Sequence, residues 1–487
     1  MGVIKRQGIK NTLSTYAGFI IGFVNLLIIQ PQFLTKEELG LTRVLYSFAL
    51  LVATFAPMGI TNTAIRYFPR FRNPEQRHHG FFGFLLFFPL AGFLLASVIL
   101  VFAKELVMER FAAESALFNE FFHYVFPLTF FLSFINVLTV YCITNYKSTI
   151  PSYLNDVGVR LLTILVVSLY YIKWLSLDQF IGAFCGIYAV QLAVLTGYIF
   201  LFDRPGWRID RTVFTPALVK EMFRYGMILW LAGVASTGLK YFDAIMIGQY
   251  MPLAFVGIYT VAAFISTIIE APLNAFDKIA SSKIAFAWQE ENKQEIDSIY
   301  KKSGLYMFLA GGFLFLNVNL CINDLLSFLP EGYQSGGTVV LILSVGSLFN
   351  MATGLNGAVL FTSSKYVYGA LFLILLALLL LVFQMWFIPL FGLEGAALAT
   401  ASASLIYNLL LCWFVHRHFG LHPFGRRNLI ILSLVVLLFG LGLLLPDSGS
   451  PLVNILYKST IVTACYGAVV AGLGLAPELL ELLRRKR

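Results

Sequence analysis

The segment FFGFLLFFPLAGFLLASVILVFA, residues 81–103, contains no charged side chain and decides the fold class. A helix needs about 20 apolar residues to cross a hydrocarbon core of roughly 30 Å. The whole chain has the same character: of its 487 residues, 59% are hydrophobic and 12% are Asp, Glu, Lys or Arg, against roughly 25% charged residues in soluble domains. So few charges cannot cover a water-exposed surface, which excludes an ordinary soluble enzyme. We therefore predict an all-α integral membrane protein.

Apolar segments of similar length recur along the chain between charged or Pro/Gly-rich breaks. The first follows Lys5, Arg6 and Lys10 as a signal peptide would, but it lacks a small-residue cleavage site, so we expect it to remain as a span. We predict about fourteen transmembrane helices, near residues 11–30, 41–65, 81–103, 121–144, 153–173, 178–202, 222–243, 251–274, 303–322, 337–361, 366–388, 393–415, 427–446 and 453–474.

The basic residues are unevenly divided between the two sets of loops. With fourteen spans, the side that holds the N-terminus collects all 34 Lys and Arg except Lys36, Arg43, Lys104, Arg110, Lys173, Lys240 and Lys458. Because cytoplasmic loops retain Lys and Arg, we predict that both termini are cytoplasmic, including the basic tail at 484–487. The net charge of +9 is then expected from loops beside anionic lipid, and no solvated basic domain indicates a nucleic-acid partner.

An internal repeat predicts two related halves. FLTKEELGLTRVLYS, beginning at Phe33, aligns with YMPLAFVGIYTVAAF, beginning at Tyr250, and this alignment places Gly40 on Gly257. Parallel repeats are common in transporters. We expect an N-terminal lobe at 1–215 with spans one to six, a C-terminal lobe at 216–420 with spans seven to twelve, and spans thirteen and fourteen with the basic tail at 421–487.

The sequence motifs of common enzymes are absent. There is no P-loop, dinucleotide-binding glycine motif, HExxH or nucleophile elbow, and no Cys/His spacing suited to a metal. We therefore expect no catalytic residues, no metal and no cofactor. An ion gradient, of protons or sodium, is the energy source that we consider.

Polar residues inside the spans are the candidate functional residues, because a polar group in hydrocarbon is costly unless it faces protein or water. They form three helical stripes: Asn11, Thr15, Gly18, Gly22 and Asn25 in the first span; Arg43, Ser47, Thr54 and Thr61 in the second; and Tyr259, Ser266, Glu270, Asn274, Asp277 and Ser281 in the eighth. In the first span we favour tight helix packing. In the eighth we favour a cavity lining, because Glu270 lies within the apolar segment.

The site prediction combines these polar residues with nearby charges. We predict that a substrate cavity is lined by Arg43, Arg66, Lys240, Asn25, Tyr259 and Asn274, and that Asp243 and Glu270 respond to a coupling ion. Lys458 is a further cation that would attract an anionic group. Pairing between Lys240 and Asp243, three residues apart on a helix, is an equal alternative to a functional role. Arg66 is also explained as an orientation anchor at a cytoplasmic helix end.

Several segments together resemble a known family. These are FLTKEELGLTRVLYSF with GITNTAIRYFPRF in the first hairpin, and YGMILWLAGVASTGLKYFDAIMIGQY followed by VGIYTVAAF later in the chain. The individual motifs are loose: Glu38 to Gly40, Arg66 with Tyr67, Asp243, and Gly257 with Tyr259. With the span count they are similar to the polysaccharide transporters, the O-antigen-type lipid-linked oligosaccharide flippases of the multidrug/oligosaccharidyl-lipid/polysaccharide flippase superfamily.

This resemblance implies both an architecture and an activity. It implies two pseudo-symmetric six-helix lobes around a central cavity, with two C-terminal helices added. It also implies a flippase of the bacterial cytoplasmic membrane that moves an undecaprenyl-pyrophosphate-linked oligosaccharide, a repeat unit of a polysaccharide or O-antigen, by alternating access. The expected partners are this substrate, membrane lipid, and a polysaccharide polymerase with other assembly proteins.

Three other functions remain open. One is an ion-coupled multidrug extruder of the same superfamily. Its members usually place a coupling acid in the first lobe, whereas spans one to six here hold almost no buried acid, and Asp156 and Asp178 lie at span ends. A second is a peptidoglycan lipid-precursor flippase, but the arginines expected in its first span are absent between Thr12 and Gln30. The third is a membrane-embedded polymerase or glycan transferase, for which the longest outer loop, about 104–120, is short.

Overall fold

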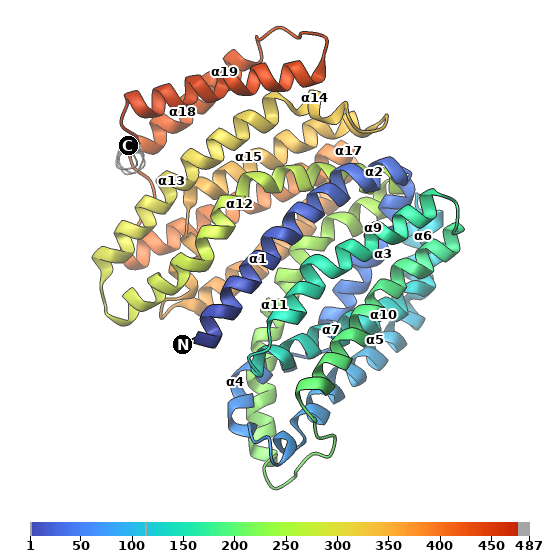
Figure 1. Ribbon diagram of the computed structural model, residues 1–487. Helices are drawn as coiled ribbons and strands as arrows, with labels where there is room; N and C mark the ends of the chain where they lie inside the picture. The colour runs from blue at the N-terminus through green and yellow to red at the C-terminus, as the bar shows by residue number, and fades with distance from the viewer. Residues whose placement is uncertain (1, 113, 476–487) are drawn as a thin grey trace. The chain divides into compact units, whose positions relative to one another are not determined.

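The computed structural model describes residues 2–112 and 114–475 and is helical, with no β-strand in those residues (Figure 1). Eleven of its helices are long and apolar enough to cross a membrane. This confirms the prediction of a multi-pass, all-α membrane protein. The predicted basic tail at 484–487 lies outside the described residues.

The number of fourteen spans stays a prediction. Helix α17, Tyr366–Phe419, has 54 residues and breaks at Gly392, whose φ is +58°. At a rise of about 1.5 Å per residue, this helix is far longer than one crossing requires. Helices α11, Pro216–Tyr250, and α18, Arg426–Gly442, are not among the eleven candidate spans.

The chain forms two compact units, 1–257 and 258–487. The first contains α1 (Gly2–Val24), η1 (Asn25–Ile29), α2 (Gln30–Phe33), α3 (Lys36–Phe55), α4 (Ile60–Phe71), η2 (Arg77–Gly80), α5 (Phe81–Ala112), α6 (Ala116–Phe121), η3 (Phe122–Tyr124), α7 (Val125–Thr144), α8 (Thr149–Tyr153), η4 (Leu154–Gly158), α9 (Val159–Tyr171), α10 (Leu177–Phe202) and α11. Helix α11, which we placed in the second lobe, packs against α3 and α4 of this unit. The predicted lobe boundary at residue 215 is untested.

The small-residue stripe of the first span is a helix-packing surface. The Asn11 amide donates to the Ser148 hydroxyl, and the Thr15 hydroxyl donates to the Asp156 carboxylate over 3.2 Å. A Cβ atom on Gly18 would overlap the Asp156 backbone. The stripe thus lets α1 approach α8 and the π-helix η4 closely, which confirms the packing interpretation.

The break between α3 and α4 is held by α11. Met58 and Gly59 have φ values of +46° and +78°, which lets the chain turn between the helices. The Thr63 hydroxyl donates to the Met222 carbonyl oxygen, and a Cβ atom on Gly226 would lie 2.5 Å from that hydroxyl. The second span is therefore two helices whose junction packs on the backbone of α11.

The two glycines that the repeat alignment superposes meet at equivalent places. Helix α12, Leu253–Gln289, begins in the first unit. A Cβ atom on Gly40 would overlap the carbonyl oxygen of Leu253, and one on Gly257 would overlap the carbonyl oxygen of Lys36. Each glycine thus contacts the residue four positions before the other, as expected if the two hairpins are related by symmetry.

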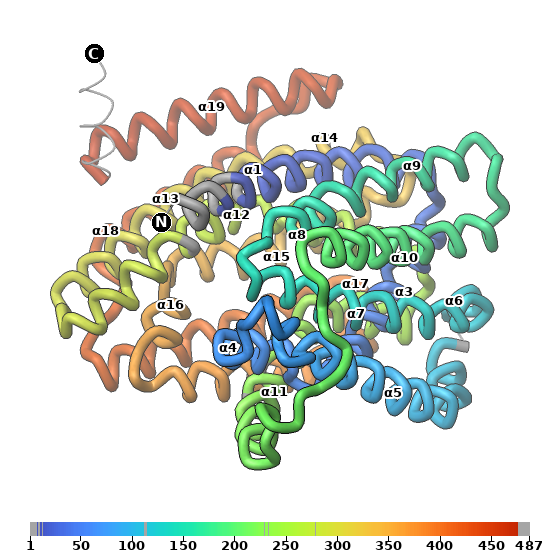
Figure 2. The backbone as a smooth tube through the Cα atoms, turned by 60° about the horizontal axis from the view of Figure 1, so that its bottom comes forward, coloured from blue at the N-terminus to red at the C-terminus, as the bar shows by residue number. Residues whose placement is uncertain are grey.

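The loop at 203–215 is attached to the turn between α4 and α5 (Figure 2). Arg77, His78 and His79 all have positive φ in this turn. His78 lies 3.6 Å from the Asp203 carboxylate and His79 lies 3.2 Å from that of Asp210. These contacts hold a left-handed segment that side chains rarely adopt.

The second unit contains the rest of α12, α13 (Lys293–Leu320), α14 (Ile322–Leu326), η5 (Tyr333–Gly336), α15 (Gly337–Thr353), α16 (Asn356–Phe361), α17, α18 and α19 (Pro451–Gly472). Helices α18 and α19 pack on α13, where Val435 and Tyr466 enter the buried core. The Tyr466 hydroxyl donates to the Leu309 carbonyl over 2.8 Å. The last two helices are therefore part of this unit's core.

Candidate functional site

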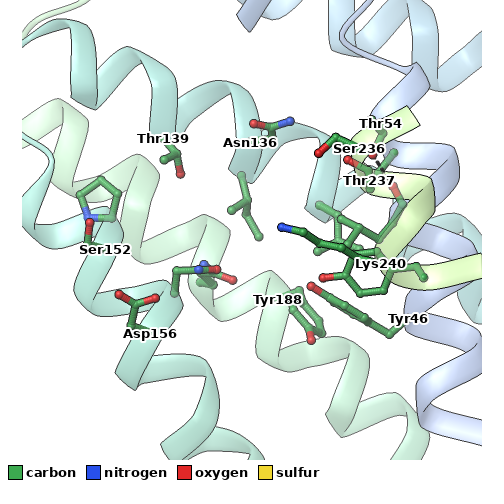
Figure 3. Close-up of a pocket in the computed structure, with 18 residues that line it drawn as sticks. Tyr46, Thr54, Asn136, Thr139, Ser152, Asp156, Tyr188, Ser236, Thr237 and Lys240 are labelled. Atoms are coloured by element: carbon green, nitrogen blue, oxygen red, sulfur yellow. Dashed lines mark hydrogen bonds between the residues drawn. The ribbon is translucent and has the colours of Figure 1, made fainter. Parts of the chain in front are cut away.

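A polar cavity of about 430 Å³ lies inside the first unit (Figure 3). Five helices, α3, α7, α8, α10 and α11, and the π-helix η4 line it. Most lining residues carry hydroxyl, amide or charged groups, namely Tyr46, Thr54, Asn136, Thr139, Ser152, Asn155, Asp156, Tyr188, Gln191, Ser236, Thr237, Lys240 and Tyr241. A polar cavity within a membrane-spanning unit indicates a path for a hydrophilic group.

Each helix presents its polar residues on one face. Asn136 and Thr139 are three positions apart on α7, as are Tyr188 and Gln191 on α10. Residues three or four apart share a helix face, so isolated polar residues in apolar helices converge here.

Lys240 is the cation of this cavity. Its side chain is exposed and extends toward the cavity centre in Figure 3, with Tyr46 and Tyr188 beside it. Within the described part of the chain it forms no ion pair, so of the two alternatives for Lys240 the pairing with Asp243 is not observed. An ammonium group with three donors is thus available to an anionic ligand.

Three tyrosines form an aromatic side of the cavity. Tyr46 stacks on Tyr188 with ring centroids 5.4 Å apart, and the edge of Tyr241 meets it at 5.9 Å. Arg43 lies near these phenols, and its Nη2 donates to the Gln30 side-chain oxygen over 2.6 Å. The rings offer flat apolar faces with polar edges, which suits a ligand that combines C–H surfaces with hydroxyl groups.

The acid of the cavity, Asp156, lies on the opposite side from Lys240 in Figure 3. It belongs to the π-helix η4, and the Thr15 hydroxyl of α1 donates to it. π-Helical turns are frequent at functional sites. The cavity therefore has separate cationic and anionic ends with uncharged polar groups between them.

Residues 4–281 match the family described as polysaccharide biosynthesis protein, which is more than half of the chain. The chain belongs to this family. The predicted family of polysaccharide transporters is thereby confirmed.

Curated relatives of this polysaccharide biosynthesis protein are distant. An uncharacterized membrane protein of Methanocaldococcus jannaschii is 22% identical over 436 residues, which cover 82% of this chain and 81% of the relative. The capsular polysaccharide biosynthesis protein CapF of Staphylococcus aureus is 23% identical over 166 residues, 34% of this chain and 41% of CapF.

Solved structures show the same fold. The lipid II flippase MurJ, in an inward closed conformation, has a TM-score of 0.70 at 14% identity and covers 96% of this chain and 99% of its own. An inward-facing multidrug resistance transporter of the MATE family, in the MOP superfamily, has a TM-score of 0.65 at 15% identity and covers 84% and 94%. Family and fold agree with the prediction of a membrane transporter of this superfamily rather than an enzyme.

Of the predicted site residues in the first unit, the cavity includes Lys240 alone, with Arg43 near its tyrosines. Asn25 is buried at the start of η1, and its side-chain oxygen has no hydrogen-bond partner among the described residues. Arg66 is exposed on α4, with its guanidinium 4.3 Å from the centre of the Tyr225 ring. Asp243 is half-buried on α11 and does not line the cavity.

The other predicted residues belong to the second unit. Tyr259 is buried and Asn274 is exposed, both on α12. Glu270, also on α12, lies near the Ser347 hydroxyl and the Asn350 amide of α15. The sequence therefore identified a half-buried acid that lies near polar side chains.

Lys458 does not fit the role of a free anion-binding cation. Its Nζ lies 2.7 Å from the Asp447 carboxylate and 3.3 Å from that of Asp324, and the residue is 8% exposed. Both acids compensate its charge. Lys458 thus joins α14, the connection after α18, and α19.

Sequence reasoning missed most of the cavity lining. Asn136, Thr139, Gln191, Ser236 and Thr237 are single polar residues in apolar helices, and none has the charge that drew attention to Lys240. A search for pairs of polar residues three or four positions apart within each span would have found them.

Proposed function

We propose that this protein is a flippase that moves an undecaprenyl-pyrophosphate-linked oligosaccharide across the cytoplasmic membrane by alternating access. The observation that supports it is the polar cavity of the first unit, in which Lys240 lies among tyrosine, amide and hydroxyl groups. Membership of the polysaccharide biosynthesis protein family favours a glycan as the cargo.

The cavity chemistry matches the two parts of such a head group. A pyrophosphate is anionic and favours a charge-assisted hydrogen bond from an ammonium group. Sugars carry hydroxyl groups, which amides and hydroxyls bind, and C–H faces, which pack on aromatic rings. We assign the pyrophosphate to Lys240 and the sugars to Tyr46, Tyr188 and Gln191.

The polyprenyl tail remains in lipid during this movement, because only the head group needs shelter from hydrocarbon. We propose that both termini are cytoplasmic and that a polysaccharide polymerase receives the translocated substrate. The basic loops support this orientation.

Ion coupling would use Glu270. Its carboxylate, with the Ser347 hydroxyl and Asn350 amide, provides the oxygen groups that a proton or sodium ion requires. The same residues also support the second candidate, an ion-coupled multidrug extruder. Against that candidate stands the family membership. A peptidoglycan-precursor flippase would share the pyrophosphate chemistry, and the missing first-span arginines weigh against it.

Transport into proteoliposomes tests the proposal. In separate assays the purified protein is offered a fluorescent undecaprenyl-pyrophosphate oligosaccharide, a fluorescent peptidoglycan lipid precursor and a cationic dye, each with imposed proton or sodium gradients. We expect the lipid-linked sugar to change leaflets, Lys240→Gln to abolish this, and the dye to stay in place. Dye efflux without lipid movement would instead establish the extruder, and movement of a peptidoglycan precursor alone would establish the other flippase.

A further inference from the structure

The first unit contains an apolar groove that the proposed transport cycle does not use. It has a volume of about 470 Å³ and lies between α3, α5 and α11. Val52 and Phe55 of α3 and Phe223, Met227 and Trp230 of α11 line it. The Trp230 indole N–H donates to the Thr54 carbonyl over 3.2 Å, so the one polar side-chain group among these lining residues is satisfied within the protein.

The floor of the groove is made by close backbone packing. Gly92 of α5 lies in the groove, and a Cβ atom at this position would overlap the backbone of Ala56 at the end of α3. Helices α3 and α5 therefore meet without intervening side chains below the groove. This contact fixes the shape of the groove, so that it is not only a gap between mobile side chains.

A second hollow, of about 610 Å³, adjoins the groove where α11 begins. Two cations, Arg211 and Lys220, border it, and Phe223 lines both hollows. Its base is packed, because Phe214 is buried and stacks on Phe71 with ring centroids 4.4 Å apart. The charged end lies at the polar loop 203–215, and the apolar groove extends from it along α11 as far as Trp230.

The length of this combined site matches one leaflet. From Lys220 to Trp230, α11 rises by about 15 Å, at about 1.5 Å per residue. Half of a hydrocarbon core of roughly 30 Å is the same depth. A lipid with its phosphate at Arg211 and Lys220 would therefore have one chain along the groove, ending near the bilayer midplane.

We propose that this site binds an anionic phospholipid of the leaflet that contacts the loop 203–215. Arg211 and Lys220 bind the headgroup phosphate, and one acyl chain occupies the groove between α3, α5 and α11. Charge complementarity selects an anionic headgroup over a zwitterionic one. The proposal does not depend on the transported substrate.

Trp230 supplies the measurement. The protein is placed in phosphatidylcholine vesicles that contain increasing fractions of phosphatidylglycerol brominated in its acyl chain, or of equally brominated phosphatidylcholine. Bromine quenches tryptophan on contact, and the difference between the wild type and Trp230→Phe isolates the signal of this residue. We expect brominated phosphatidylglycerol to quench Trp230 at a clearly lower fraction than brominated phosphatidylcholine.

Two charge variants separate the site from general attraction to the membrane. The double variant Arg211→Gln/Lys220→Gln should raise the phosphatidylglycerol fraction needed for half-maximal quenching by roughly tenfold, given the attraction per basic residue. The matched control Arg204→Gln/Arg224→Gln removes two exposed cations outside the hollow and should leave it unchanged.

Three results would overturn the proposal. Equal quenching by the two brominated lipids would show that bulk lipid fills the groove. An unchanged preference for phosphatidylglycerol over phosphatidylcholine in Arg211→Gln/Lys220→Gln would show that lipid binding in the groove does not depend on these two cations. Relief of quenching by a small fraction of undecaprenyl phosphate, but not by more phosphatidylglycerol, would assign the site to polyprenyl lipids instead.

Discussion

Lys240 lies in a cavity whose other lining residues are mostly uncharged, so its ammonium group sets the anion preference of that cavity. Arg43, in contrast, donates a hydrogen bond to the Gln30 side chain and lies near the three tyrosines of the cavity. We therefore expect it to help position these tyrosines. The two cations are close to the same cavity but have different surroundings. We therefore expect different consequences when each is replaced.

Lys240→Gln should weaken binding of an undecaprenyl-pyrophosphate oligosaccharide by about ten- to a hundredfold, because a hydrogen bond to a charged group contributes about 1.5–3 kcal/mol. Lys240→Arg should retain most of the affinity. The measurement is a titration of the detergent-solubilised protein with the fluorescent lipid. Lys104→Gln, which changes an exposed lysine in the C-terminal part of α5, serves as control, and an equal loss of affinity in this variant would remove Lys240 from the site.

Asp210 makes the loop 203–215 sensitive to acid. Its pKa is lowered by hydrogen bonds from the Thr212 hydroxyl and backbone N–H, and then by His79. A lowered pKa in the folded state means that this carboxylate adds stability above its unfolded value of about 4 and that the contribution is lost as the pH falls through the lower folded value.

We accordingly expect hydrogen exchange in the loop, corrected for the intrinsic rate, to increase when the pH falls below about 4. In Asp210→Asn this added pH dependence should disappear. Glu75→Gln, an exposed acid of the α4–α5 connection, is a suitable control. The same acid response in Asp210→Asn and wild type would place the titrating group elsewhere.

At the scale of the helices, close backbone contacts determine the packing. Gly18, Gly40, Gly92 and Gly257 each lie against the backbone of a neighbouring segment. The stripe in the first span was predicted to be a packing surface from the spacing of its small and polar residues alone. That spacing sufficed for the prediction because small residues on one face of a membrane helix commonly serve close helix packing.

Gly40→Ala and Gly257→Ala should each lower the thermal stability, with a cost of about 1–3 kcal/mol for the forced separation of the backbones. Gly197→Ala, on α10 with no neighbouring atom within 4 Å, should be neutral or slightly stabilising. Melting curves of purified protein in one detergent would measure this. Melting points equal to that of Gly197→Ala would show that the helices separate at no cost.

At the scale of the whole chain, membrane class and helical architecture followed from composition and the length of apolar segments. The cavity did not, because the spacing of polar residues shows which of them share a helix face but not which faces of α7, α10 and α11 turn toward one another. Charge directed the site prediction toward Arg66 and Lys458. In the structure, the Arg66 guanidinium lies over the Tyr225 ring, and Lys458 pairs with two acids.

The last two helices are expected to stabilise the second unit. A chain that ends before α18 would expose the face of α13 that contacts Val435 and Tyr466. We expect this deletion to lower the melting temperature by roughly 5–10 °C. A protein cleaved at an inserted protease site within 446–450 keeps both helices and is the control. Equal stability of the two forms would show that α18 and α19 are dispensable.

The contact between Gly40 and Gly257 also has a mechanical consequence. Where side chains interlock, one helix turns past another only by moving knobs out of grooves, in discrete steps. Between α3 and the first turn of α12, two backbones meet at a point, and neither glycine has a side chain to withdraw. The crossing angle can therefore vary smoothly while the point of contact stays fixed. The contact thus allows rotation about a fixed point, and a larger residue at either glycine would restrict that rotation to discrete steps.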